Sequence, residues 1–311
     1  MPAKLRSVSY VMPVLNEEKH LAHAVESIFS QEFDGPTEVI LALGPSKDGT
    51  NAVAAEVAKR FNVVLVENPT GKTPAGLNHA IRAASHDVVV RVDAHSVLSP
   101  GYTQSAVEIL NETGADNVGG LMRSVGETSF QRAVAFAYQH RIGLGGGAFH
   151  VGGEAGPSDT VYLGVFRREK LLAVGLFDEE LVRGQDWELN MRIRKSGGTV
   201  WFDPRLSVEY YPRSTLRALS KQFFDTGFWR ARITKLSPGQ ASLRYFVPPA
   251  LVISSVLIAP ALVYFAVVLL VSLTAGSLAF SSRLRLLYVL PVMHYCWGAG
   301  FIRGLFARHL H

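Results

Sequence analysis

The 311-residue sequence predicts an α/β fold in which a mostly parallel sheet is flanked by helices and followed by membrane-associated helices. Up to about residue 120, short runs of β-branched residues alternate with segments of helical periodicity. A basic, aromatic-rich segment follows at 213–245, and residues 246–311 contain no Lys, Asp or Glu. These composition changes predict three parts: a domain of residues 1–212, an amphipathic membrane-interface segment of residues 213–245, and transmembrane helices within residues 246–311.

The first part begins with repeated strand–helix pairs. The predicted strands are 8–12, 38–43, 63–66, 88–92 and 117–118, and the predicted helices are 17–31, 50–61, 73–84 and 102–112. In a parallel sheet built from such pairs, ligands bind beyond the carboxyl ends of the strands. We therefore expect the chemistry in the loops that follow the strands.

The remainder of the first part is less regular. Residues 143–158 are rich in glycine and predict a long mobile loop without a regular helix or strand. Order is expected to resume at 160–166. A polar helix is predicted at 185–195, because the glycines at 197 and 198 provide a stop signal directly after it.

The basic segment 213–245 carries seven Lys and Arg side chains, a single acid, Asp225, and interleaved aromatic residues. A basic, aromatic-rich helix next to an apolar tail predicts a helix that lies in the membrane interface. The alternative is a solvated helix that packs its aromatic side chains on the first part.

The apolar tail contains two long hydrophobic runs. Residues 246–280 carry no charge, and 286–306 is interrupted only by Arg303. These lengths predict two transmembrane helices, or three if the first run divides near Pro260. The basic flank predicts that the first part faces the cytosol, and residues 1–6 have no signal-peptide core. We therefore expect a multi-pass protein of the cytoplasmic membrane.

Composition excludes several classes of protein. Residues 1–245 carry 27 basic and 26 acidic side chains, so the basic excess lies mostly in the apolar tail, which argues against nucleic acid as a partner. The single cysteine, Cys296, excludes an internal disulfide framework and a Cys-cluster zinc site. Cys296 and His294 lie in an apolar run and are interpreted as packing residues.

Polar residues follow the first three predicted strands. Pro13 is expected to end the first strand, and Asn16 then leads to Glu17, which opens a helix, so a nucleotide could bind in this loop. Asp48 follows the second strand and either contacts a ligand or caps the next helix. Lys72 lies on a glycine turn just before a helix N-terminus, an arrangement suited to a diphosphate.

Two further sites carry carboxylates. Asp93 and His95 leave the fourth predicted strand two residues apart and could together bind one divalent ion, and Asp186 stands at the start of the polar helix. Each residue also has a simpler interpretation. Asp93 would cap a turn, His95 would be a hydrogen-bonded structural residue, and Asp186 would cap its helix.

Taken in this order, these segments resemble the family 2 inverting glycosyltransferases, whose catalytic domain has the GT-A fold. The matching segments are 13–17, 48–50, 93–95 at the family's metal-binding Asp-x-Asp, 185–186 at its catalytic Glu-Asp pair, and Gln222, Gly227 and Trp229 at the Gln-x-x-Arg-Trp motif of processive members. The sequence is still more similar to the succinoglycan-type (ExoA-like) glucosyltransferases, through segments 91–95, 118–120, 159–161, 175–179, 185–192 and 211–213. The resemblance covers residue 8 to about residue 250.

The resemblance implies a role for each residue. The residues that would bind the donor are Pro13, Asn16, Glu17, Asp48, Lys72, Asn78 and Asp93. A divalent cation, Mn²⁺ or Mg²⁺, would be held by Asp93 and His95, and the imidazole favours Mn²⁺. Asp186 would be the catalytic base. The acceptor would be bound by Asp159, Gln185, Gln222 and Trp229, although Asp159 could instead fix the glycine-rich loop and Trp229 could instead anchor the interface.

Two positions depart from the family pattern. Leu43 and Gly44 stand where an acidic residue usually contacts the nucleotide base, so the base of the donor is open, with a UDP-hexose favoured. His95 replaces the last aspartate of the metal motif.

The predicted function is a membrane-anchored, inverting transferase that moves a hexose from a nucleotide-sugar donor to a lipid-linked or growing polysaccharide acceptor beside membrane lipid. The cation and Lys72 would stabilise the leaving diphosphate, and Asp186 would deprotonate the attacking hydroxyl. The alternatives are a polyprenyl-phosphate glycosyltransferase, whose acceptor is already ionised, and a catalytically inactive glycan-binding membrane scaffold. A transporter is disfavoured, because the tail offers four arginines and no acid for an ion relay.

Overall fold

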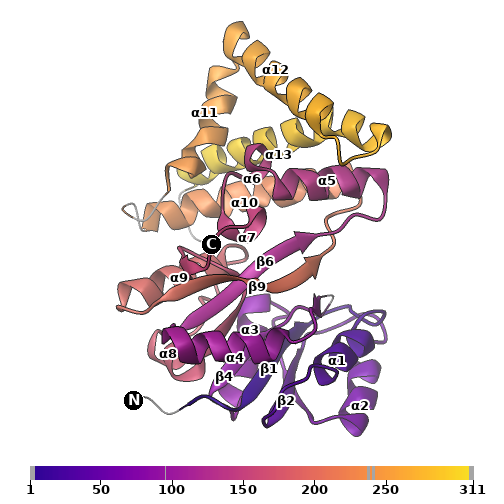
Figure 1. Ribbon diagram of the computed structural model, residues 1–311, viewed down its shortest axis with the longest axis vertical. Helices are drawn as coiled ribbons and strands as arrows, with labels where there is room; N and C mark the ends of the chain where they lie inside the picture. The colour runs from indigo at the N-terminus through magenta and orange to yellow at the C-terminus, as the bar shows by residue number, and fades with distance from the viewer. Residues whose placement is uncertain (1–3, 95, 237–238, 240–241, 308–311) are drawn as a thin grey trace. The chain divides into compact units, whose positions relative to one another are not determined.

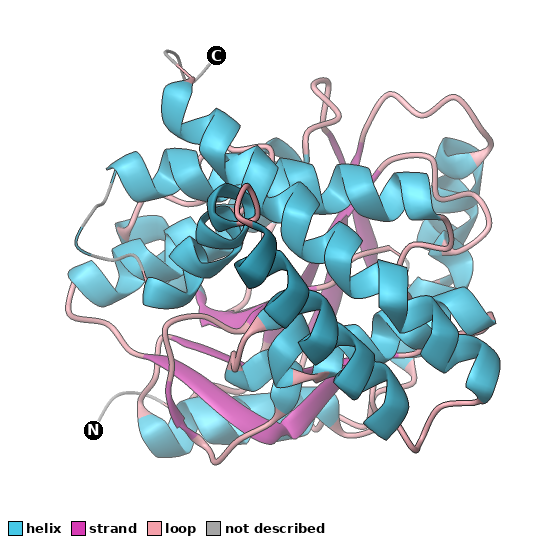
Figure 2. Cartoon of the chain, turned by 90° about the horizontal axis from the view of Figure 1, so that it is seen from above, coloured by secondary structure: helices cyan, strands magenta, loops and turns pink. Residues whose placement is uncertain are grey.

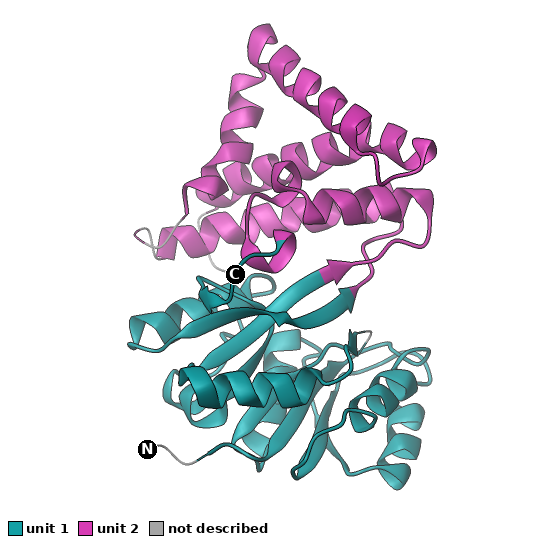
Figure 3. Cartoon of the chain, in the orientation of Figure 1, with its two compact units in different colours: residues 1–122, 152–209 teal, residues 123–151, 210–311 magenta. Residues whose placement is uncertain are grey.

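The protein separates into two compact units (Figure 3). The computed structural model describes residues 4–94, 96–236, 239 and 242–307. Unit 1 comprises residues 1–122 and 152–209, and unit 2 comprises residues 123–151 and 210–311. Each unit is described by itself below.

Unit 1 is built on one sheet. Among the described residues this sheet has nine strands in the order β3-β2-β1-β4-β8-β6-β9-β5, and β7 pairs with β9. The strands are β1 (Val8–Val14), β2 (Thr37–Leu43), β3 (Val63–Glu67), β4 (Val88–Arg91), β5 (Val97–Leu98), β6 (Asn117–Ser124), β7 (Gly156–Pro157), β8 (Tyr162–Arg167) and β9 (Val200–Tyr210). The helices are α1 (Leu21–Phe29), α2 (Thr50–Arg60), α3 (Thr73–Ala83), α4 (Tyr102–Thr113), α8 (Arg168–Ala173) and α9 (Gln185–Lys195).

The sheet is mixed rather than mostly parallel. Strands β3, β2, β1 and β4 run parallel, as the strand–helix alternation predicts. The later strands pair antiparallel, with β8 between β4 and β6 and with β9 beside β5 and β7. The predicted α/β class is therefore confirmed, but among the described residues only β1 to β4 pair in parallel.

The core of unit 1 follows from the two-residue period of the strands. Alternate side chains of β1, from Val8 through Tyr10 and Met12 to Val14, are buried in one cluster with residues of α1, α2 and α4. Helix α3 connects β3 to β4 in the reverse direction, so a right-handed crossover brings it to the other face. Helices therefore lie on both faces of the strands (Figures 1 and 2).

Three predicted boundaries differ from the structure. Strand β1 runs through Pro13, which does not end it; the ladder with β4 stops at Val11, so the missing proline N–H costs no bond on that side. Helix α1 begins at Leu21 rather than at Glu17. The glycine-rich segment contains regular elements, the short helices α6 (Arg141–Leu144) and α7 (Ala148–Val151) and strand β7, because its glycines cluster between these elements.

Unit 2 is helical. Besides α6 and α7, its helices are α5 (Ser129–Gln139), α10 (Leu216–Leu236), the 3-10 helix η2 (Leu243–Phe246), α11 (Val247–Ser254), α12 (Ile258–Thr274) and α13 (Phe280–Phe306). Phe223 of α10 is buried and its ring packs edge-on against Tyr138 of α5. Helix α10 therefore buries part of its aromatic face inside unit 2.

Helices α10 and α13 approach each other at glycines. A Cβ built on Gly300 would collide with the carbonyl oxygen of Phe224, and one built on Gly227 would collide with the carbonyl oxygen of Trp297. Backbone groups cannot move aside as a flexible side chain can. This close packing therefore requires glycine at both positions.

Substitution of Gly300 by Ala is expected to lower the free energy of unfolding by about 2 kcal/mol, because overpacking exceeds the gain in helix propensity. Thermal unfolding of the full chain measures the change. Gly276→Ala is the matched control, since a Cβ there would lie 3.9 Å from the nearest atom, the carbonyl oxygen of Thr274. Equal unfolding temperatures for the two variants would contradict the close packing.

The structure does not support the transmembrane helices predicted within residues 246–311. In the part of the chain that the structure describes, no helix combines the length and the apolar character that a membrane crossing requires. The apolar run breaks between α11 and α12, where Leu257 is extended, leaving helices of 8 and 17 residues. Helix α13 has 27 residues but includes Arg283, Arg285 and Arg303.

Candidate active site

The loops that follow β1 and β2 are interlocked. Asn16 adopts the left-handed conformation, with φ of 57°, and its Oδ1 accepts a hydrogen bond of 2.8 Å from the N–H of Lys47. The N–H of Asn16 donates to Ser46 Oγ at 3.0 Å, and the N–H of Glu17 donates to Thr50 Oγ1 at 2.8 Å. The predicted donor loop at 13–17 is therefore held by the second loop.

Asp48 is bound by its own surroundings. Its carboxylate accepts the hydroxyl and the N–H of Thr50, the first residue of α2, and the N–H of Glu18 at 3.4 Å. The hydroxyl of Thr50 is the main reason why the pKa of Asp48 is lowered, so the group is a carboxylate at neutral pH. Asp48 therefore bonds to the first residue of α2, although the N-cap itself is Gly49, and donor binding by Asp48 remains a prediction.

The ends of the first three strands meet at glycines. A Cβ on Gly44, after β2, would lie 3.0 Å from Leu15 and 3.2 Å from the Cα of Gly71. Gly71 has a φ of 63° and forms the turn before α3, and the side chain of Lys72 is exposed at the start of that helix. Close packing thus accounts for Gly44. Together with Leu43, Gly44 stands where the family usually has an acidic residue.

Two further residues predicted to bind the sugar donor are Pro13, which packs against α3, and Asn78, which belongs to α3. Pro13 is 3.1 Å from the position that a Cβ on Gly76 would occupy. Asn78 is buried, and its Nδ2 donates to the carbonyl oxygen of Phe177 and to Glu179 Oε1, both at 2.8 Å. The structure therefore shows Asn78 fastening the segment that precedes α9, and a direct role in donor binding stays a prediction.

Arg91, the last residue of β4, contacts two predicted site residues, the metal-binding and donor-binding candidate Asp93 and the catalytic candidate Asp186. Its guanidinium donates through Nη1 to Asp186 and through Nη2 to Asp93 Oδ1, the latter at 3.1 Å. The side chain of Arg91 is 7% exposed, whereas those of Asp93 and Asp186 are 24% and 39% exposed. Burial lowers the pKa of Arg91, but the two carboxylates outweigh it and raise the pKa above its usual value.

The arrangement brings two of the predicted site residues together. Asp93 and Asp186 are far apart in the chain, yet their carboxylates contact the same guanidinium and keep exposed surface. Arg91 itself belongs to the segment 91–95, but sequence reasoning gives it no role. The sequence feature that could have indicated a role for Arg91 is a charged residue at the end of a strand of valines, Val88 to Val90.

Asp186 stands on a firmly held helix. Gly184, with φ of 78°, forms the N-cap of α9, and Gln185 is buried at its first position. One turn after Asp186, Asn190 accepts a hydrogen bond of 2.6 Å from Asn117 Nδ2 and donates one of 2.9 Å to Thr160 Oγ1. These buried amide bonds fix α9 against the sheet.

The predicted acceptor residues are divided between the units. Gln185 and the half-buried Asp159, which precedes Thr160, belong to unit 1. Gln222 and Trp229 lie on α10 in unit 2. Gln222 Nε2 donates to Tyr210 Oη at 3.2 Å, and the guanidinium of Arg232 lies 5.1 Å from the Trp229 ring centre.

Only part of the predicted metal site lies among the described residues. His95 lies outside the described residues. Within the described part of the chain, no three His, Cys, Asp or Glu side chains converge to hold a metal ion. Of the predicted pair only Asp93 is described, and its role as a metal ligand stays a prediction.

The chain was compared with known proteins. The glycosyl transferase family 2 model matches residues 9–173. The succinoglycan biosynthesis protein ExoA of Rhizobium meliloti (strain 1021) is 31% identical over 309 residues, which cover 95% of this chain and 94% of the relative. A dolichyl N-acetyl-alpha-D-glucosaminyl phosphate 3-beta-D-2,3-diacetamido-2,3-dideoxy-beta-D-glucuronosyltransferase of Methanococcus voltae is 24% identical over 313 residues, or 96% of this chain and 97% of the relative.

A solved structure shows the same fold. The mannosyltransferase PcManGT of Pyrobaculum calidifontis, in complex with GDP-Man and Mn²⁺, matches with a TM-score of 0.64 and 18% identity, covering 99% of this chain and 89% of that one. This match confirms the predicted GT-A-like fold. The assignment to a family rests on two findings. The family model matches more than half of the chain, and one relative is 31% identical. The chain belongs to glycosyl transferase family 2 and is a glycosyltransferase.

Proposed function

We propose that the protein is a metal-dependent, inverting glycosyltransferase that moves a hexose from a nucleotide sugar to a lipid-linked or growing glycan. The contact of Arg91 with both Asp93 and Asp186 is the observation that carries this proposal. It supports a site in which one acid serves the leaving group and the other serves the nucleophile. An aspartate that only caps its helix would not need to share a buried guanidinium with a second acid.

The two acids would have different tasks. Lys72 would bind the diphosphate end of the donor directly, and Asp93 would bind it through the divalent cation, while Asp186 accepts the proton of the acceptor hydroxyl. As the acceptor oxygen forms its bond to the anomeric carbon, the bond from that carbon to the diphosphate oxygen breaks, and the diphosphate leaves with the electron pair. A single displacement inverts the configuration at the anomeric carbon.

A divalent cation fits this site only with help from the donor. The carboxylate of Asp93 is a hard oxygen ligand that Mn²⁺ and Mg²⁺ accept, and His95 would add an imidazole that favours Mn²⁺. With one described carboxylate, the diphosphate oxygens and water would complete the coordination. When bound, the cation supplies Lewis-acid stabilisation of the negative charge that develops on the leaving diphosphate.

Removal of divalent ions with EDTA is expected to lower turnover at least 100-fold, because the leaving diphosphate would lose its counter-charge. Readdition of Mn²⁺ should restore it, and Mg²⁺ should restore less. Initial rates with a labelled donor, measured across a metal titration, test this expectation. Unchanged turnover in EDTA would exclude a metal-dependent mechanism.

The acceptor is proposed to be presented at a lipid surface. Unit 2 carries 14 Lys and Arg side chains against two acidic ones. Apolar side chains on and beside α11, α12 and the start of α13 are widely exposed, among them Val256, Ile258 and Phe280. Exposed apolar surface with a basic surround favours attachment to an anionic membrane surface. A relative is named for a dolichyl phosphate-linked acceptor, which supports the same assignment.

One experiment tests donor, metal and acceptor together. Membranes that contain the protein are incubated with labelled UDP- and GDP-hexoses, with and without Mn²⁺ and extracted lipid. The proposal expects transfer of label to a lipid-extractable or polysaccharide product that depends on both additions. Neither transfer nor hydrolysis of any donor would favour the alternative of an inactive glycan-binding scaffold.

A further inference from the structure

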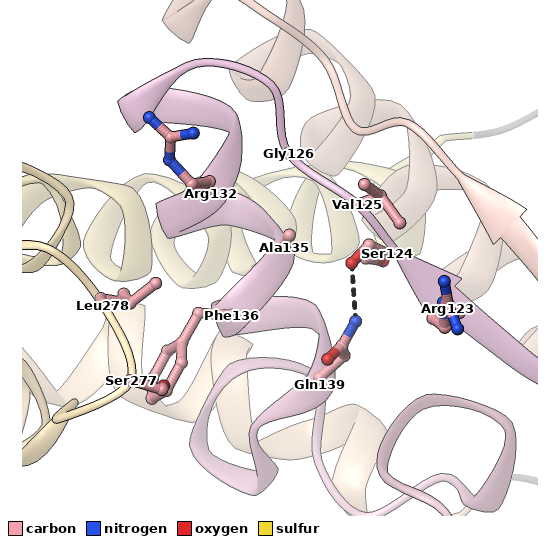
Figure 4. A pocket seen from close by; sticks show the side chains of 10 residues that line it. All are labelled: Arg123, Ser124, Val125, Gly126, Arg132, Ala135, Phe136, Gln139, Ser277 and Leu278. Carbon is pink, nitrogen blue, oxygen red and sulfur yellow. Dashed lines mark hydrogen bonds between the residues drawn. The ribbon is translucent and has the colours of Figure 1, made fainter.

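Unit 2 contains a cavity of about 340 Å³ that none of the roles above uses (Figure 4). Its lining comes from the end of β6, from α5 and from the turn between α12 and α13. Helix α5 presents one face to it, with Arg132, Ala135, Phe136 and Gln139 at helical spacing. The volume falls within the range of small-molecule sites in proteins.

The charged part of the lining is cationic. Arg123 and Arg132 lie on opposite sides of Ser124 and Ala135 in the close-up view (Figure 4). Both arginine side chains are exposed, and the surrounding unit carries 14 basic and two acidic residues. A guanidinium forms forked hydrogen bonds with phosphate oxygens, so this lining favours an anion of that type.

A buried hydroxyl supplies a second, independent observation. Ser124 is 6% exposed, and its Oγ has no hydrogen-bond partner among the described residues. Its carbonyl oxygen, by contrast, accepts a bond of 2.7 Å from Gln139 Nε2 (Figure 4). A buried hydroxyl without a partner costs stability, so a ligand oxygen that accepts from Ser124 would remove this cost.

The remaining lining is apolar. Ala135 and Phe136 of α5 and Leu278 of the α12–α13 turn contribute this part. Such side chains gain little from a free inorganic anion but would contact a hydrocarbon chain attached to one. The lining therefore combines anion recognition with apolar contact.

We propose that this cavity binds a phosphate or diphosphate group carried on an apolar chain. The inference deepens the proposed function, because a lipid-linked acceptor would bring such a group, and it rests on that function for the identity of the acceptor. A membrane phospholipid headgroup has the same chemistry. The experiment below separates the two sources.

Calorimetric titration of the full chain with farnesyl diphosphate tests the site. EDTA is present throughout, so that a metal-dependent diphosphate site elsewhere in the chain contributes nothing. Arg132→Gln is expected to weaken binding about tenfold, the value of one charge-assisted hydrogen bond. Ser124→Ala is expected to weaken binding several-fold without lowering the unfolding temperature. Arg141→Gln removes the same charge from an exposed position of unit 2 outside the cavity and should bind like the parent.

Two further probes identify the source of the phosphate. Inorganic pyrophosphate should bind at least tenfold more weakly than farnesyl diphosphate, because it lacks the chain. Loss of phosphatidylglycerol vesicle binding in Arg132→Gln, with farnesyl diphosphate unaffected, would support the cavity as a phospholipid site instead. If neither Arg132→Gln nor Ser124→Ala alters binding of either amphiphile, the inference fails. Asp186→Asn should bind all probes normally, so loss of turnover and failure of this site are distinguishable.

Discussion

Replacement of Asp186 by Asn is expected to lower turnover with a sugar hydroxyl acceptor by about 1,000-fold, within the range typical for loss of a general base. The acceptor hydroxyl is too weak an acid to attack as an alkoxide at neutral pH, so its proton must be taken as the new bond forms. An amide has the size of the carboxylate but cannot accept that proton. Steady-state rates of glycosyl transfer, with saturating donor and metal, give the measurement.

A control and a second acceptor sharpen this test. Asp34→Asn makes the same chemical change at an exposed position of unit 1 and should keep full activity. With a polyprenyl-phosphate acceptor, which is already ionised, the effect of Asp186→Asn should be much smaller, and this difference separates the two acceptor classes. Full turnover of Asp186→Asn on a glycolipid hydroxyl would refute the proposed mechanism.

Replacement of Arg91 by Lys is expected to reduce kcat at least 100-fold. Lysine keeps the positive charge, but its single ammonium cannot reproduce the planar fork that contacts Asp93 and Asp186 together. Both acids would lose their fixed orientation, and a small displacement of catalytic groups is costly. Arg91 is buried, so weakening its ion pairs should lower the free energy of unfolding. Because both acids are partly exposed, we expect the loss to be about 2 kcal/mol. Rates and thermal unfolding measure the two effects separately.

The chain provides a matched control for this substitution. Arg205 also forms ion pairs with two acids, Asp203 and Glu112, but its side chain is 52% exposed. Asp203 is only 4% exposed, but the N–H of Arg205 also donates to it, so Arg205→Lys should leave kcat unchanged and lower the unfolding temperature less than Arg91→Lys does. If Arg91→Lys and Arg205→Lys behaved alike, Arg91 would have no special role in aligning the acids.

The sequence predicts the catalytic unit better than the helical one, for physical reasons. The alternation of strand and helix is a local pattern, and so the first four parallel strands and their loops are predictable. The rule that functional loops gather at strand ends accounts for Asp93, which follows β4, but not for Asp186, which begins α9 after the loop that follows α8. The role of Arg91 was missed because burial of a charge depends on partners that are distant in the chain.

The helical unit was harder to predict because apolar composition does not say what the side chains contact. Residues 246–280 have the composition of a long span, yet the chain becomes extended at Leu257 and divides the run. From the sequence, Gly227 has only a motif match and Gly300 has no role, whereas both glycines make close backbone contacts in the structure. Such contacts become visible only when two helices are placed together.

The shared guanidinium also links the energetics of the two acids. Arg91 divides its hydrogen bonds between Asp93 and Asp186, so loss of one acid leaves the whole cation to the other. Effects of substitutions at the two positions should consequently not add in a double-mutant cycle. A kinetic defect measured at one aspartate would therefore contain a contribution from the other, and neither residue's share could be assigned from a single variant.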